Sequence, residues 1–278
     1  MINLALAIAS SALVSVIMRA SEKRVRNNVS MLALNYVMCL AMAAVFTGAQ
    51  RLSLTGNGAG FAYGIGAVNG FLYLGSFLLL QWNVRKNGVV LPATFMKLGV
   101  LVPTVMAIAV FRETPTAMQI AGIAAALAAI VMINFEKGEG RAKSGIGLVA
   151  LLLGGGMADA TSKVYEELGN EAFKNHFLLF TFGVALVLCV LLCIAKKQKL
   201  TPVDALFGLL IGVPNYFSTR FLLLSLASVP AVVAYPTYSV GTIVLVTLIG
   251  TVVFGERLSR RQAAALAIIL AALAMLNL

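Results

Sequence analysis

Apolar residues fill long runs of this chain, and short polar stretches separate the runs. A bilayer core about 30 Å thick requires roughly 20 apolar residues per crossing helix, which rises about 1.5 Å per residue. This length gives ten predicted helices, at residues 2–20, 29–48, 58–81, 88–111, 116–135, 145–163, 176–195, 203–226, 230–254 and 260–277. The pattern therefore predicts an all-α integral membrane protein with ten transmembrane helices.

One stretch of the chain occurs twice. When residues 111–134 are shifted by 143 positions onto 254–277, ten of the 24 positions are identical. The identical pairs are Phe111/Phe254, Glu113/Glu256, Gln119/Gln262, Ala121/Ala264, Ala124/Ala267, Leu127/Leu270, Ala128/Ala271, Ala129/Ala272, Met132/Met275 and Asn134/Asn277. Self-similarity at a long period indicates a duplicated unit, here residues 1–140 and 141–278.

Each predicted unit contains five helices. An odd number of crossings places the second unit in the membrane upside down relative to the first. Inverted repeats of this kind are typical of alternating-access transporters, whose substrate site lies near the midplane between the repeats. We therefore expect one transport domain made of two inverted five-helix repeats.

Composition supports a membrane protein and gives it an orientation. Hydrophobic residues make up 60% of the 278 residues, charged residues make up 11%, and the net charge is +11. In the predicted topology 15 Lys and Arg residues fall on one side and four on the other. The basic side faces the cytoplasm by the positive-inside rule, so both termini are expected outside a bacterial inner membrane. Basic residues in short loops set orientation, and we expect no nucleic-acid partner.

The repeated segment also resembles a known family. Residues 111–115 followed by Gln119 and Gly122, and residues 254–258 followed by Gln262, resemble the gE-x-l-x-x-x-q-x-x-G segment of EamA-type repeats. Arg19 and Lys163 stand where a basic residue commonly closes the first helix of such a repeat. The chain is thus similar to the ten-helix members of the drug/metabolite transporter superfamily, which implies secondary transport of small metabolites, often export.

The resemblance has departures. Arg112 and Ala265 stand where glycine is expected, and Ser11 and Gly155 stand where the family often carries tryptophan. Loss of an aromatic residue near the expected cavity means that substrate preferences of other members do not transfer to this chain.

Four charged residues lie inside predicted helices, namely Lys97, Asp159, Arg220 and Lys163. A charge there costs about 2.5–3.5 kcal/mol on insertion scales, so each one requires a partner or a use. Lys97 lies near the middle of the fourth helix, and Asp159 follows the glycine run 154–156 in the sixth. Either they bind substrate or a coupling proton, or Asp159 neutralises Lys97 or the nearby Lys163. Both interpretations stay open at this stage.

Arg220, in the eighth helix with Tyr216 one turn earlier, is a second candidate cation. Its guanidinium suits forked recognition of a carboxylate or phosphate, although it could also snorkel outward. Lys163 is interpreted as a structural residue at a helix end. Glu113 and Glu256 are interpreted as carboxylates that hold the turns before the helices that follow them.

Smaller polar groups complete the predicted substrate site. Asn69 and Tyr73 share a face of the third helix, Tyr238 and Thr242 share one of the ninth, and Ser15 lies on the first. Each tyrosine is equally consistent with a core or interface position. The glycines at 60, 64, 66 and 70 have the spacing that lets helices pack closely.

These residues lead to a functional hypothesis. We expect a secondary transporter, working as an exporter, of amino acids or organic anions, because two interior cations face one carboxylate. The alternative within transport is proton-coupled export of cationic drugs through Asp159. A membrane enzyme and a passive channel are less favoured, since no nucleophile triad, phosphate loop or metal-ligand set is recognisable. The expected partners are a small-molecule substrate, the lipid bilayer and a candidate coupling proton, with no cofactor and a monomeric state.

Overall fold

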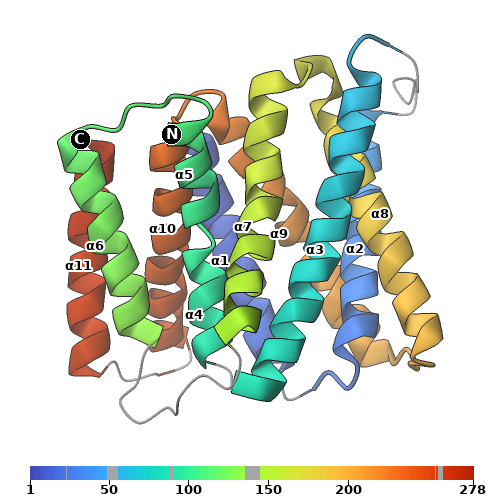
Figure 1. The fold of residues 1–278 in the computed structure, drawn as a ribbon. Helices are drawn as coiled ribbons and strands as arrows, with labels where there is room; N and C mark the ends of the chain where they lie inside the picture. The colour runs from blue at the N-terminus through green and yellow to red at the C-terminus, as the bar shows by residue number, and fades with distance from the viewer. Residues whose placement is uncertain (23, 49–55, 88–89, 135–144, 254, 256–258) are drawn as a thin grey trace.

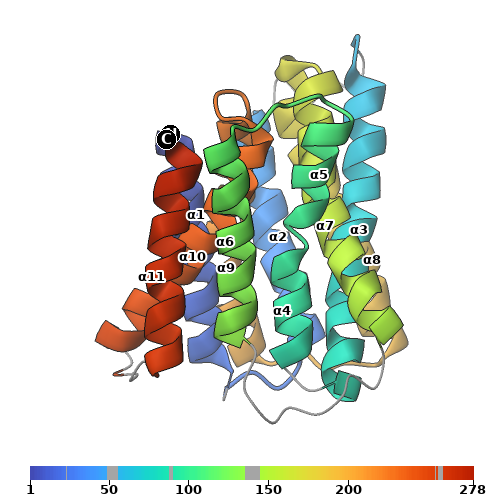
Figure 2. The same ribbon diagram turned by 60° about the vertical axis from the view of Figure 1, so that its left-hand side comes forward.

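The structure is a computed structural model that describes residues 1–278 except 23, 49–55, 88–89, 135–144, 254 and 256–258. Its helices stand side by side in one upright bundle (Figure 1), and a turned view shows the same packing in depth (Figure 2). Within the described residues, nine helical segments are long and apolar enough to cross a membrane, and 117–133 forms a shorter apolar helix. The predicted all-helical membrane fold is confirmed.

The helices follow the predicted segments closely. They are α1 (Ile2–Ser21), α2 (Asn28–Thr47), α3 (Ala59–Asn87), α4 (Val90–Leu98), α5 (Leu101–Ala109), α6 (Ala117–Asn134), α7 (Gly145–Leu168), η2 (Glu171–Phe173), α8 (Lys174–Ala195), α9 (Pro202–Leu226), α10 (Ala231–Val253) and α11 (Arg260–Asn277). The continuous fourth helix predicted at 88–111 is wrong, because the helix is interrupted between α4 and α5.

Two helices extend beyond their predicted ends because their polar residues are paired. α3 continues past residue 81 to Asn87, and the Asn83 amide donates to the carbonyls of Leu79 at 2.8 Å and Gly147 at 2.9 Å. α7 continues past residue 163 to Leu168, and its last turns carry ion pairs of Lys163 with carboxylates three and four residues later. The length of the apolar run places the helix end at the last apolar residue, whereas the observed helix continues through the paired polar residues.

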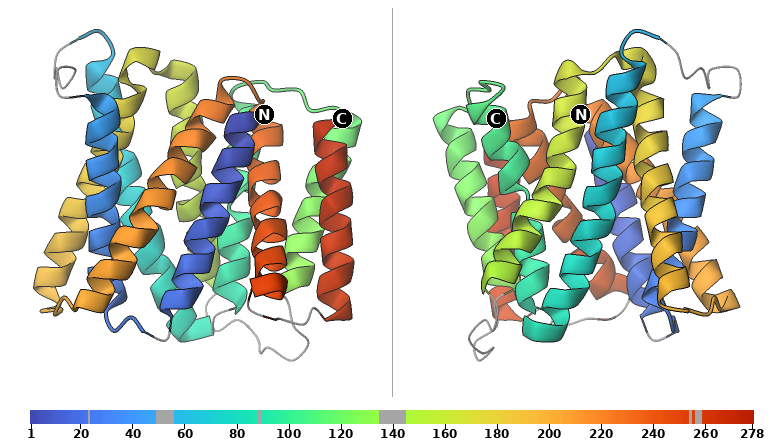
Figure 3. Two further views of the ribbon diagram at one scale, coloured as in Figure 1. Left: turned by 180° about the vertical axis from the view of Figure 1, so that it is seen from behind. Right: turned by 45° about the vertical axis from the view of Figure 1, so that its right-hand side comes forward.

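The bundle has two chemically different ends. α1 begins and α11 ends at the same end, which we call the terminal end (Figures 1 and 3). At the opposite end α1, α3 and α8 finish and α11 starts. We call this the basic end, because its described loops and helix ends carry Arg19, Arg24, Arg26, Arg85, Lys86, Lys196, Lys197, Lys199, Arg260 and Arg261.

The first five transmembrane segments interlock with the last five. α9 packs on α1 and α2, α8 packs on α2 and α3, α7 packs on α3, α4 and α5, and α11 packs on α6. Paired segments of the two halves also run in opposite directions, as α1 and α7 do in Figure 1. The core is therefore built between the halves.

Glycine allows two of these contacts to be close. A Cβ atom at Gly66 or Gly70 of α3 would lie 2.7 or 2.6 Å from a backbone oxygen of α8. A Cβ atom at Gly208 or Gly212 of α9 would lie 2.4 or 2.6 Å from a backbone oxygen of α2. Small residues four apart thus bring backbones together. Of the four glycines proposed from the sequence, Gly60 and Gly64 face open space and take no part.

The repeated glutamines act at helix starts. The Gln119 side chain accepts from the Thr116 N–H at 3.0 Å, and the Thr116 hydroxyl accepts from the Gln119 N–H at 3.2 Å. Ser259 and Gln262 make the same reciprocal pair at the start of α11. These are capping boxes, which satisfy free N–H groups in the first helical turn. The duplicated glutamine is thus explained by helix capping.

The α3–α8 contact gives a test of the packing. We expect Gly70→Val to destabilise the protein by about 1–3 kcal/mol, because the added methyl groups would overlap the α8 backbone. The matched change Gly64→Val, where nothing lies within 4 Å of the added Cβ, should cost less than about 0.5 kcal/mol. Thermal unfolding of the purified protein in detergent measures both, and equal losses would contradict this account.

Candidate functional site

A central cavity of about 320 Å³ lies between the middle of the bundle and the basic end. α1, α2, α3, α4, α7 and α9 contribute to its wall, which is largely apolar. The lining residues are Val14, Met18, Met31, Leu32, Asn35, Tyr36, Tyr73, Ser76, Phe77, Leu80, Met96, Gly155, Ala158, Asp159, Ile211 and Asn215. A pocket of this kind, apolar with a few convergent polar groups, is the usual form of a small-molecule site.

Polar side chains from three helices meet at the inner part of this cavity. The Asn215 amide of α9 donates to the Asn35 carbonyl oxygen of α2 at 3.1 Å. One turn further along α9, the Thr219 hydroxyl lies 3.3 Å from the hydroxyl of Tyr73 on α3. Thr219 also donates to the backbone carbonyl of Asn215 at 3.2 Å. Tyr73 and Thr219 therefore close the cavity on the side of the terminal end.

Lys97 and Asp159 face one smaller pocket next to this cavity. The pocket has a volume of about 180 Å³, and its lining residues are Met96, Lys97, Val100, Asp159, Tyr235, Tyr238, Ser239 and Thr242. Asp159 and Met96 line the central cavity as well. Lys97 also lines a further pocket of about 200 Å³, together with Ser15 and Thr242. These neighbouring pockets share lining residues. Five residues predicted from the sequence line them: Lys97, Asp159, Tyr238, Ser15 and Tyr73.

The interruption of the fourth transmembrane segment positions the lysine. α4 ends at Leu98, and the Gly99 N–H bonds back to the carbonyls of Phe95 and Met96 at 3.1 and 3.2 Å. Lys97 therefore stands in the last turn of α4, where the partial negative charge of a helix C-terminus favours a cation. Discontinuous helices near the midplane are typical of substrate sites in transporters.

Glycine also allows this interruption to lie against α7. A Cβ atom at Gly156 would lie 2.3 Å from the carbonyl oxygen of Gly99, so only glycine fits there. Its neighbour Gly155 faces open space and lines the central cavity. Of the glycines before Asp159, Gly156 thus allows a close backbone contact, and Gly155 leaves the cavity wall open.

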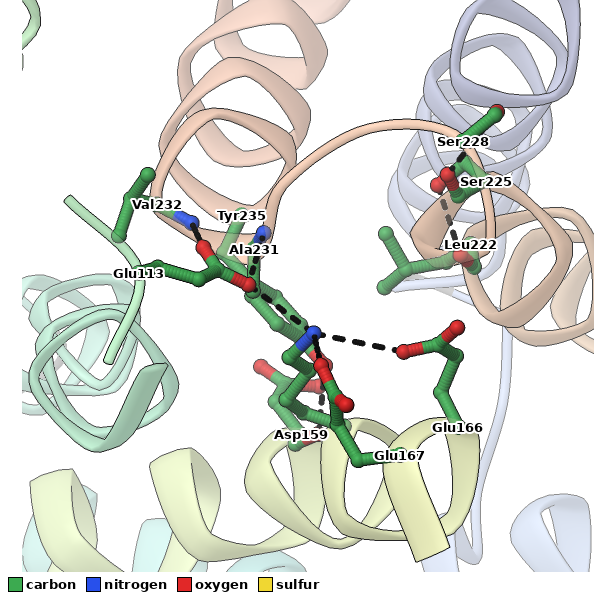
Figure 4. A network of polar contacts seen from close by, with 11 residues as sticks. Glu113, Asp159, Glu166, Glu167, Leu222, Ser225, Ser228, Ala231, Val232 and Tyr235 are labelled. Atoms are coloured by element: carbon green, nitrogen blue, oxygen red, sulfur yellow. Dashed lines mark hydrogen bonds and ion pairs between the residues drawn. The ribbon is translucent and has the colours of Figure 1, made fainter. Parts of the chain in front are cut away.

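Lys97 and Asp159 are near each other without forming a close ion pair. Among the described residues, no carboxylate oxygen lies within 4.0 Å of the Lys97 amine. Both side chains are partly exposed to the pockets. The Asp159 backbone carbonyl accepts from the Tyr235 hydroxyl at 2.8 Å, which ties α7 to α10 (Figure 4). The amine and the carboxylate are therefore not held in a close ion pair with each other.

A cluster of charged residues lies toward the terminal end (Figure 4). Lys163 of α7 is 2% exposed, and its amine lies 2.9 Å from Glu113 and 3.3 Å from Glu166, with Glu167 also bonded. The Glu113 carboxylate also accepts from the N–H groups of Ala231 at 3.0 Å and Val232 at 2.9 Å. One carboxylate thus joins the segment before α6 to α7 and to the start of α10.

This cluster changes two sequence-based interpretations. Lys163 pairs with Glu113, Glu166 and Glu167, so the proposed neutralisation of Asp159 by Lys163 is wrong. Glu113 does not cap the helix that follows it, because its bonded N–H groups belong to α10. The corresponding interpretation of Glu256 lies outside the described residues.

Arg220 and Tyr216 lie apart from the Lys97–Asp159 pocket. The Arg220 guanidinium donates to the Asn175 side chain at 2.6 Å and to the Tyr216 hydroxyl at 3.0 Å, and stacks 4.3 Å from the centre of the Phe46 ring. It is therefore held between α2, α8 and α9, toward the terminal end. Neither residue lines the pockets around Lys97 and Asp159, so their predicted role in substrate binding stays a prediction.

One predicted residue, Asn69, lines none of these pockets, and three cavity residues were not predicted. Asn69 is completely buried, and neither of its amide atoms has a hydrogen-bond partner among the described residues. Sequence reasoning missed Asn35, Asn215 and Tyr36 in the cavity wall, because it weighed charges above neutral amides. An asparagine inside an apolar run was the available signal, since a buried amide also requires a partner.

Comparisons with known proteins point in the same direction. A family model described as Small Multidrug Resistance protein matches residues 175–269, which include α8, α9 and α10 and leave out Lys97 and Asp159. A protein of Haemophilus influenzae, named only "Uncharacterized protein", is 25% identical over 198 residues, which are 69% of this chain and 67% of that one. One crystal structure shares the fold, with a TM-score of 0.78 at 16% identity over 99% of this chain and 98% of the other. The family match and the apolar helices together indicate a multi-pass membrane transporter.

Proposed function

We propose that this protein is a secondary transporter of small zwitterionic or anionic metabolites, working by alternating access. The observation that carries the proposal is the shared pocket of Lys97 and Asp159, in which an interior amine and an interior carboxylate face the same space without a close ion pair. Interior charges are costly unless they are used, and a solute with both charges would satisfy both. The substrate class we favour is an amino acid or a small organic acid.

The cavity next to the charges supports this class. A carboxylate of the solute would bind Lys97, and an ammonium group would bind Asp159. The apolar part of the solute would then enter the 320 Å³ cavity, whose lining includes Met18, Met31 and Met96. Methionine is flexible and polarizable, so such a wall accepts different shapes.

Two inverted repeats, residues 1–140 and 141–278, would supply the movement. Packing between helices has matching pairs under exchange of the halves: α1 on α9 matches α7 on α3, and α2 on α9 matches α8 on α3. The α6–α11 pair matches itself. This pattern, together with the opposite helix directions, supports an axis in the membrane plane and a site between the repeats, as in other inverted-repeat transporters.

The described conformation fits a state of the alternating-access cycle that is open toward the basic end. The cavity lies toward the basic end, and Lys163 with its carboxylates would hold the terminal end closed. The basic end would face the cytoplasm of a bacterial inner membrane by the positive-inside rule, with both termini outside. The cavity would then receive solute from inside the cell, which agrees with export.

A second candidate is proton-coupled export of cationic compounds through Asp159. The match to a Small Multidrug Resistance protein favours it, and Asp159 borders both the central cavity and the smaller pocket. In this case Lys97 would hold the carboxylate, and a cationic substrate would compete with a proton for it.

The leading proposal is tested through the amine. In proteoliposomes screened with radiolabelled amino acids and organic acids, we expect transport of at least one carboxylate, reduced about 10–100-fold by Lys97→Met. A charge-assisted hydrogen bond lost from the bound solute accounts for this range. Lys196→Met, which removes an exposed lysine at the basic end, should transport normally. Transport of cationic dyes with no carboxylate, or full activity of Lys97→Met, would refute the proposal.

The second candidate is tested by proton release. Tetraphenylphosphonium is added to the purified protein in weakly buffered detergent solution, and the pH is followed. Exchange of a proton for the cation at Asp159 predicts release by the native protein and none by Asp159→Asn. Our leading proposal predicts no release from either protein. Equal release from both would exclude Asp159 as the coupling group.

The closure of the terminal end gives a third test. Lys163→Met leaves three carboxylates facing one another, so we expect it to favour opening at that end. Gly155→Cys reports on the cavity, because nothing lies within 4 Å of a Cβ atom there. Its labelling by a charged methanethiosulfonate from the basic end should slow several-fold in Lys163→Met. Lys174→Met, which breaks an exposed pair with Glu171 at the same end, should leave the rate unchanged. An unchanged rate in Lys163→Met would show that the cluster is not a gate.

A further inference from the structure

Asn69 of α3 is a polar side chain with no function in the described conformation. Its side chain is 0% exposed, and neither the amide nitrogen nor the amide oxygen has a hydrogen-bond partner among the described residues. Burying an amide without partners is unfavourable, and an orphaned group in a folded protein calls for a specific explanation. Leucine, of similar shape, would avoid the cost.

Another asparagine of the same helix shows what a structural role looks like. Asn83 is also 0% exposed. Its amide donates to the carbonyls of Leu79 and Gly147 and its oxygen accepts from Asn87 at 3.1 Å. Asn83 therefore fixes α3 against α7. Asn69 makes no comparable contact, so packing does not account for its polarity.

The position of Asn69 relates it to the cavity. Residues 69, 73, 76 and 80 share one face of α3 at helical spacing. Tyr73, Ser76 and Leu80 of this set line the central cavity. Asn69 continues the same face by one turn toward the terminal end, beyond the contact of Tyr73 with Thr219. Along this face of α3, Asn69 is the next polar side chain after Tyr73 in the direction of the terminal end.

Aromatic rings pack against Tyr73 and against one another toward the terminal end. Phe182 lies against Tyr73 with ring centres 6.1 Å apart. Toward the terminal end, Tyr165 of α7 is stacked between Phe61 at 6.2 Å and Phe177 at 4.6 Å. Tyr165 precedes Glu166 and Glu167 of the charged cluster, so movement of α7 away from α10 would move this stack as well.

We propose that the Asn69 carboxamide is a hydrogen-bonding subsite for the polar head group of the transported solute, closed off here and exposed when the terminal end opens. Its NH₂ group would donate to a carboxylate, and its oxygen would accept from an ammonium group. Because the amide carries no charge, it holds either group more weakly than Lys97 or Asp159 does, which suits release. The inference rests on the proposed alternating access and adds a second binding position for the solute along the transport path.

A pair of matched substitutions tests whether the amide is unsatisfied. Asn69→Leu removes an orphaned group, so the thermal unfolding temperature in detergent should stay level or rise by about 2–4 °C. Asn83→Leu breaks established bonds and should lower it by about 2–4 °C or more. Transport by Asn69→Leu should fall about tenfold or more, because the hydrogen-bonding amide is lost. If Asn69→Leu is as destabilised as Asn83→Leu, or transports at the native rate, the proposal is wrong.

Accessibility tests the same idea without transport. Asn69→Cys is made with Cys39, Cys189 and Cys193 replaced by alanine, and a membrane-impermeant methanethiosulfonate is applied from either side. We expect negligible labelling in the native background, and labelling from the terminal end at least tenfold faster in Lys163→Met. Labelling from the basic end, or no labelling in either background, would overturn the proposal.

The two experiments separate this inference from the function it rests on. If no solute is transported by the native protein, the proposed function fails, whereas the unfolding and labelling results still report whether Asn69 becomes exposed. If transport is intact and the Asn69 results are negative, only the subsite fails.

Discussion

The Glu113 carboxylate joins three parts of the bundle that are far apart in the sequence. It accepts two backbone N–H bonds from the start of α10 and pairs with Lys163 of α7. A helix N-terminus inside a membrane protein has N–H groups that lipid cannot satisfy, so a carboxylate there is strongly favoured. The buried amine of Lys163 in turn requires acidic partners. The contact of α7 and α10 with the segment before α6 follows from these two requirements together.

Polar groups at the middle of the bundle also need partners that lipid cannot supply. Most polar groups there bond within their own helix or to a neighbour, as Tyr235 does with the carbonyl of Asp159. Lys97 and Asp159 instead face pockets. The middle of the bundle thus contains two kinds of polar group. Some are hydrogen-bonded and hold helices together, whereas Lys97 and Asp159 line pockets and mark the candidate site.

Much of this arrangement could be predicted from the sequence. Apolar length located the ten segments, and the cost of charge singled out Lys97 and Asp159, which the structure brings to one pocket. The interruption at Gly99 was not predicted, because an apolar run looks the same whether its helix is continuous or broken. Partners distant in sequence were also missed. Nothing local in the chain indicates that Glu113 bonds to residue 231, or that Arg220 bonds to Asn175.

The backbone contact between Gly99 and Gly156 has a consequence for selectivity. Lys97 stands beside this contact on α4, in the first proposed repeat, and Asp159 stands beside it on α7, in the second. Any shift of one repeat against the other therefore changes the separation between the amine and the carboxylate. A solute whose own charges have a fixed spacing fits only part of that range, so the length of the molecule would decide which shape of the protein it stabilises.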